Sequence, residues 1–168
     1  MTSIKRPIGI NVLQAARERV SYAFDHFEAV YVSFSAGKDS SVMMHIVLDE
    51  AIKRKRKVGI LLIDLEAQYT LTIKHAEEMF SLYAEHIDLY WVCLPLKLRN
   101  AVSNYEPVWC AWDPERKDDW VRPMPKGLGV ISDPSFFDFF VFCLVFGVFI
   151  VLFAVWYVNG RSTAGFIG

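Results

Sequence analysis

A short run of small and polar residues is the part of this chain best suited to chemistry: Ser35-Ala36-Gly37-Lys38-Asp39-Ser40-Ser41. It follows an apolar segment over 29–34, which predicts a strand, and leads into a helical pattern that begins near residue 40. A glycine lets backbone N–H groups approach an anion, and the start of a helix adds free N–H groups and the positive end of its dipole. Lys38 adds a full charge, and Ser40 and Ser41 add hydroxyl donors. We therefore expect this loop to hold phosphate or pyrophosphate.

The loop is not a Walker A motif. That motif requires serine or threonine directly after Gly-Lys, and here Gly37-Lys38 is followed by Asp39. Its order instead resembles the S-G-G-K-D-S loop of the PP-loop ATP pyrophosphatase superfamily, with Ala36 in place of the first glycine. An alanine costs little where φ is negative, and we interpret the substitution in that way. The alternative is an ordinary turn between a strand and a helix, with a serine that caps the helix.

A second likeness follows the next expected strand, over 58–63, which ends in Asp64. Members of the superfamily similar to phosphoadenylyl-sulfate (PAPS) reductase carry an Asp-Thr-Gly element here. Asp64 matches the aspartate, whereas Leu65 and Glu66 depart from the Thr-Gly. With the segments 109–114 and 125–129, the chain looks most like the subgroup of co-regulators of immunoglobulin-binding protein expression. The resemblance covers about residues 11 to 135.

The resemblance implies the adenine nucleotide α-hydrolase fold and binding of ATP or a related adenine nucleotide, which an active member cleaves between its α and β phosphates. By this resemblance Lys38 and Ser40 are the catalytic residues, and Asp39 and Asp64 are the candidate ligands of Mg²⁺. The acceptor substrate is unknown. The implied nucleotide-binding residues are Ser35, Ala36, Gly37, Lys38, Asp39, Ser40, Ser41 and Asp64.

Two other functions stay open beside ATP cleavage. One is a non-catalytic regulatory or adaptor protein that keeps the nucleotide-binding fold. The other is a sulfonucleotide reductase, which is disfavoured because the chain lacks the late Glu-Cys-Gly-type segment of those enzymes. Cys93, Cys110 and Cys143 lie in no comparable motif and form no C-x-x-C pair.

Alternating strand and helix patterns predict the elements that position the loop. Helices are expected from Asn11, as N-cap, to about residue 27, over 40–56 and over 70–86, and a third strand over 87–93. This order predicts an α/β fold: a parallel twisted sheet with helices on both faces, in a nucleotide-binding domain over 1–135. Ligands of such sheets bind beyond the carboxyl ends of the strands, so the loop and Asp64 should lie together.

Regular patterning is lost over 94–134, where prolines alternate with tryptophans and charged residues. One interpretation is a lid over the nucleotide, with Arg116, Lys117 or Arg122 near phosphates and a tryptophan against the base. The other is a segment that packs on itself.

Residues 136–168 are expected to form a very apolar helix and the start of a further strand over 163–168. No charge occurs over 139–158, a length sufficient to cross a bilayer as a helix. We therefore expect membrane contact or self-association through this segment, with residues 1–135 in the cytoplasm. A buried helix is the alternative. The resemblance implies a Gly-x-Arg element after that strand, so we also expect the chain to be truncated at its C-terminus.

The composition adds no strong signal for nucleic acid, because the 168 residues have a net charge of −1 and a pI of about 6.4. The one dense basic run, 53–57, falls at the end of an expected helix, where cations suit the dipole. The three separated cysteines and the lack of an apolar stretch in residues 1–9 fit a cytoplasmic protein.

Overall fold

The structure is a computed structural model of the chain, and it describes residues 9–100, 103–127, 129–141, 144–158 and 163–167. Five parallel strands form the main sheet in the order β6-β3-β2-β1-β8. Their bounds are β1 Ala29–Ser33, β2 Val58–Ile63, β3 Ile87–Val92, β6 Val130–Ile131 and β8 Thr163–Ile167. The expected α/β class and the parallel sheet are confirmed, and β8 lies within the expected strand over 163–168, of which residue 168 is outside the described residues.

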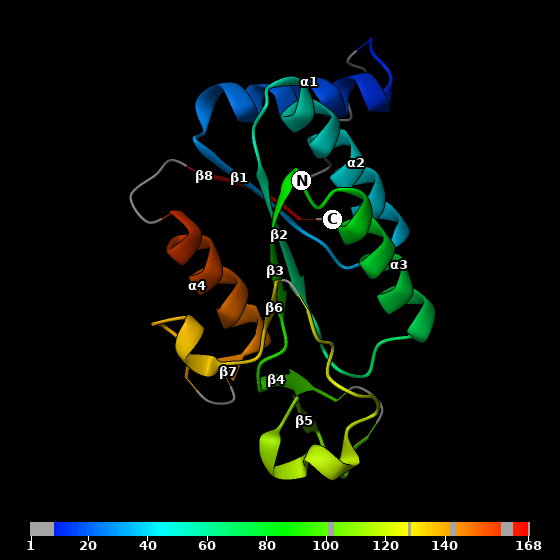
Figure 1. Ribbon diagram of the computed structural model, residues 1–168, viewed down its shortest axis with the longest axis vertical. Helices are drawn as coiled ribbons and strands as arrows, with labels where there is room; N and C mark the ends of the chain where they lie inside the picture. The colour runs from blue at the N-terminus through cyan, green and yellow to red at the C-terminus, as the bar shows by residue number, and fades with distance from the viewer. Residues whose placement is uncertain (1–8, 101–102, 128, 142–143, 159–162, 168) are drawn as a thin grey trace, which may run out of the picture.

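Three helices cover one face of this sheet: α1 Val12–His26, α2 Lys38–Lys53 and α3 Thr70–Leu82 (Figure 1). Asn11 caps α1 as expected, since its side chain accepts a hydrogen bond from the Gln14 amide. Alternate strand residues, including Val32 and Ile60, face these helices and share a core with them. This core holds β1 and β2 rigid just before the loop and Asp64.

The opposite face is covered by one helix, α4 Phe146–Val158 (Figure 1). Phe149, Phe153 and Tyr157 of α4 are buried against the sheet. Tyr157 lies so close to Gly59 of β2 that a Cβ on this glycine would be 2.6 Å from the tyrosine hydroxyl. A glycine in the central strand thus makes room for the aromatic packing of α4.

The expectation of a single apolar helix over 139–158 is wrong. The segment instead holds the short strand β7 Leu144–Val145 followed by the 13 residues of α4. Within the part of the chain that the structure describes, no helix combines the length and the apolarity needed to cross a bilayer, which corrects the expected membrane span. Long-range pairing explains the difference, because β7 joins a second sheet instead of extending the helix.

That second sheet has the order β5-β4-β7, with β4 Leu96–Arg99 and β5 Val108–Ala111. The segment 94–134, expected to be irregular, therefore contains two paired strands as well as β6. Two short 3₁₀ helices complete it, η1 Pro114–Asp119 and η2 Pro134–Phe136.

Candidate functional site: the loop after β1 and the segment that packs on Asp64

The loop of small and polar residues begins where β1 ends. The chain runs from β1 through β2 to β3 in one direction across the sheet, and later returns to place β8 on the other side of β1. The carboxyl end of β1 is therefore the topological switch point of the sheet, the usual ligand position in open α/β folds. The loop occupies this position.

Ala36 and Glu66, at the two positions where the resemblance noted in the sequence would place glycine, have left-handed backbones. Ala36 has φ +57°, so the expected negative φ at this position is wrong. Glu66, which stands where the Asp-Thr-Gly element has glycine, has φ +65°. Glycine adopts such angles without strain, whereas an alanine or a glutamate does so at a cost of about 1–2 kcal/mol. The backbone is thus the one that glycine favours, although the residues differ.

Gly37 is the N-cap of α2, and it makes no side-chain capping bond. The amides of Lys38, Asp39 and Ser40, in the first turn, have no acceptor within the helix. The first amide with such an acceptor is that of Ser41, which donates to the Gly37 carbonyl at 3.0 Å. The side chains of Lys38 and Asp39 are 90% and 84% exposed, with Nζ and Oδ1 4.0 Å apart. Donors and a mobile cation therefore lie at the start of α2.

The serine hydroxyls, in contrast, are engaged within the loop. The hydroxyls of Ser40 and Ser41 donate to the Gly37 carbonyl at 3.0 and 2.8 Å. Ser35 and Ser40 are joined at 3.0 Å, and Ser35 is the donor because the Ser40 proton is already used. The hydroxyls therefore fix the loop, and the backbone amides of the first turn and the Lys38 ammonium are the groups that could donate to a ligand.

His75 of α3 was not among the residues expected at the loop. Its Nε2 lies 2.8 Å from the Ser41 hydroxyl oxygen and, since Ser41 donates to Gly37, the imidazole is the donor. No spacing pattern pointed to it, because the two residues are 34 positions apart on different helices. His75 ties α3 to the loop.

Asp64 is fully buried, which differs from the expectation that it would bind the nucleotide or Mg²⁺. Its Oδ2 accepts from the Trp91 indole at 2.8 Å, and its Oδ1 accepts from the Glu66 amide at 2.9 Å and from the Arg122 guanidinium. Both oxygens are thus occupied by donors of the chain itself. In this arrangement Asp64 anchors other residues, and among the two suggested magnesium ligands only Asp39 is exposed.

The buried carboxylate of Glu66 holds the segment 112–122 in place. Its two oxygens accept from the amides of Trp112 at 2.8 Å and Val121 at 3.0 Å. The Trp112 indole donates to the Asp64 carbonyl at 2.7 Å, and the Arg122 guanidinium lies over the Trp112 ring. Of the lid residues considered above, Arg122 is therefore bound to Asp64, whereas Arg116 pairs with Asp119.

Cys93 is not arranged as a nucleophile. Cys93 is 1% exposed, and burial, followed by the nearby Asp64 carboxylate, raises the pKa of its thiol far above the usual range. Cys110 is half-buried, its sulfur lies 3.9 Å from the Ala111 carbonyl oxygen, and Cys143 lies outside the described residues. The Nδ1 of His45 in α2 lies 2.8 Å from the Tyr83 hydroxyl oxygen.

The chain is similar in sequence to a bacterial protein. The chain is 39% identical over 169 aligned positions to the uncharacterized protein YbdN of Escherichia coli (strain K12). The alignment covers all of this chain and 41% of that protein, so the chain spans less than half the length of its relative. No family model and no solved structure matches the chain.

Proposed function

We propose that the chain binds ATP or a related adenine nucleotide through residues 35–41, as a PP-loop protein of the PAPS reductase-like type with an adenine nucleotide α-hydrolase fold. One observation carries this proposal: the loop lies at the switch point of a parallel sheet and opens a helix that has no side-chain cap. The left-handed backbones of Ala36 and Glu66 support it further, because both occur where the family has glycine.

The nucleotide phosphates would be held by the amides of the first turn of α2 and by the Lys38 ammonium. An active protein would join the acceptor to the α-phosphate and release pyrophosphate, by positioning and charge stabilisation without a protein nucleophile. Asp39 is the residue that could bring Mg²⁺ to the phosphates, since Mg²⁺ is commonly bound by one carboxylate together with phosphate oxygens. Ser35, Ser40 and Ser41 would keep the loop in shape.

A nucleotide-binding regulatory or adaptor protein is the second candidate. The observation that favours it is the occupied state of Asp64, which leaves fewer carboxylates for metal-assisted catalysis than the resemblance implies. A sulfonucleotide reductase is disfavoured, because a buried thiol with a raised pKa is a poor nucleophile.

Calorimetric titration of the protein with MgATP tests the proposal. Lys38→Ala removes a charge-assisted contact worth about 1.5–3 kcal/mol, so affinity should fall about 10- to 100-fold. Lys74→Ala is the matched control, because Lys74 is an exposed lysine of α3 outside the loop. Equal affinity of the Lys38→Ala protein would overturn the assignment. If MgATP binds as expected, release of pyrophosphate from ATP would indicate an enzyme, and no release would indicate the adaptor.

Self-association is the part of the expectation for 139–158 that we still propose. Val148, Val151 and Val155 of α4 are 46%, 62% and 67% exposed, one or two turns apart on the helix. Association of two copies would cover these valines. Sedimentation analysis should show a dimer that Val151→Asp dissociates, and a monodisperse monomer of the unmodified chain would contradict the proposal.

A further inference from the structure

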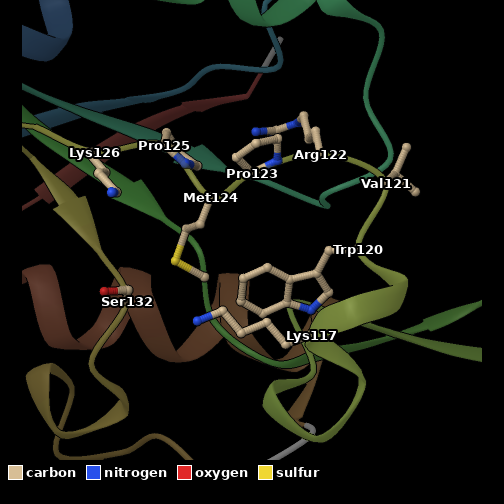
Figure 2. A pocket seen from close by; sticks show the side chains of 9 residues that line it. All are labelled: Lys117, Trp120, Val121, Arg122, Pro123, Met124, Pro125, Lys126 and Ser132. Carbon is tan, nitrogen blue, oxygen red and sulfur yellow. The ribbon is translucent and has the colours of Figure 1, made fainter.

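A cavity of about 690 Å³ lies beside the segment that Asp64 and Glu66 hold. We call it the Trp120 cavity; its lining residues are Lys117, Trp120, Val121, Arg122, Pro123, Met124, Pro125, Lys126 and Ser132 (Figure 2). Its volume is within the range of small-molecule sites. None of the residues 35–41 lines it, so it is separate from the loop after β1.

The charged residues of the Trp120 cavity are all cations. Arg122 is neutralised by Asp64, but Lys117 and Lys126 have no carboxylate within 4.0 Å in the described part of the chain. Both lysines are exposed, and no aspartate or glutamate is among the lining residues. Two uncompensated positive charges around one hollow favour an anion.

The apolar walls of the cavity are held in fixed positions. The Trp120 indole packs edge to face on Trp112, with ring centroids 5.0 Å apart, and donates to the Asp113 carbonyl at 2.9 Å. Trp112 is itself 1% exposed. In Figure 2 the Met124 thioether and the Trp120 indole border the hollow, and Lys126 and Ser132 lie farther from the indole. The Lys117 ammonium lies over the Trp120 ring, 5.8 Å from its centroid. A rigid indole facing a flexible thioether suits a flat ring.

We propose that the Trp120 cavity is a binding site for a planar aromatic carboxylate, whose ring lies against Trp120 and Met124 and whose carboxylate is held by Lys117, Lys126 and the Ser132 hydroxyl. Binding itself does not depend on ATP.

The probe pair is 2-naphthoate and 2-naphthamide, which have nearly the same shape and differ in charge. Titrations of the full chain, followed by the indole N–H signals in ¹H–¹⁵N spectra, should show 2-naphthoate shifting the signal that Trp120→Phe removes. An exposed ion pair contributes about 0.2–1 kcal/mol, so Lys117→Gln and Lys126→Gln should each weaken binding by up to about fivefold, and the double variant by more. Lys74→Gln is the control and should bind as the unmodified chain does.

Three results would overturn the site: equal binding of the amide and the carboxylate, equal loss in Lys74→Gln and Lys117→Gln, or loss of 2-naphthoate binding in Lys38→Ala. The last would mean that the anion occupies the loop after β1. Since both lysines are exposed, unchanged melting temperatures should confirm that the variants fold. If MgATP fails to bind while 2-naphthoate binds through Lys117 and Lys126, the proposed function fails and the site stands.

Discussion

Replacing Asp64 by asparagine removes the charge from a fully buried group that four donors surround. The carboxylate accepts from the Trp91 indole, the Glu66 amide and the Arg122 guanidinium, and the Cys93 sulfur lies 3.8 Å from Oδ2. An asparagine has one acceptor oxygen, so its NH₂ group must face either the indole N–H or the amide and guanidinium. A donor then opposes a donor without water, and Arg122, whose side chain is 18% exposed, loses its counter-ion.

Removing one partner of a buried ion pair destabilises a protein by about 3–5 kcal/mol. For a chain of this size, that loss lowers the melting temperature by about 6–20 °C. As an implied nucleotide-binding residue and Mg²⁺ ligand, Asp64 would instead be expected to affect mainly the affinity for Mg-nucleotide. The structure makes the loss of stability the expected result.

Thermal unfolding followed by circular dichroism measures this effect. Asp88→Asn is the matched control, because Asp88 pairs with Lys57 at 3.6 Å at the other end of the sheet and is 52% exposed. The control should change stability by less than about 1 kcal/mol. A double-mutant cycle with Arg122→Gln isolates the pair. A melting temperature for Asp64→Asn equal to that of Asp88→Asn would refute the reasoning.

Three further predictions concern other positions. Ala36→Gly should change the free energy of unfolding by less than about 1 kcal/mol, because relief of about 1–2 kcal/mol of strain is offset by glycine's backbone entropy and a lost buried methyl; urea titration measures it. Hydrogen bonds from Arg54 hold the pKa values of Glu50 and Asp25 below their usual 4.5 and 3.8. The two carboxylates therefore contribute fully to the stability of the folded chain above these usual values, and this contribution is lost as the pH falls through their lowered pKa values. Urea titrations from pH 7 to 3 should show a smaller loss of stability in Arg54→Gln than in the unmodified chain. Cys93 should resist iodoacetamide at pH 8 until urea unfolds the chain, as mass spectrometry of the modified peptide would show.

Local patterns were sufficient to predict the elements around the loop. The apolar run over 29–34, the break at Gly37 and the periodicity that follows predicted β1 and α2 to within a few residues, although α2 begins at Lys38 and ends at Lys53. The order of strands and helices predicted the parallel sheet. These features depend on neighbours in the sequence, and hydrophobic periodicity reports such neighbours directly.

Features that depend on distant partners could not be predicted in the same way. Asp64 appeared to be free because Arg122 lies 58 positions away, and the run over 139–158 appeared to be one helix because the partner of β7 is β4. The positive φ of Ala36 was missed for another reason. Residue type favours a backbone angle but does not determine it, and the loop imposes the angle that glycine would adopt.

The two amides that donate to Glu66 have a consequence for the motions of the chain. The N–H groups of Trp112 and Val121 belong to a segment with little regular structure, and both end on a carboxylate that is 3% exposed. They can exchange with solvent deuterium only when Glu66 separates from them, which also uncovers the surroundings of Asp64. Their exchange should therefore be as slow as that of strand amides in the sheet, and both should speed up together when the segment opens.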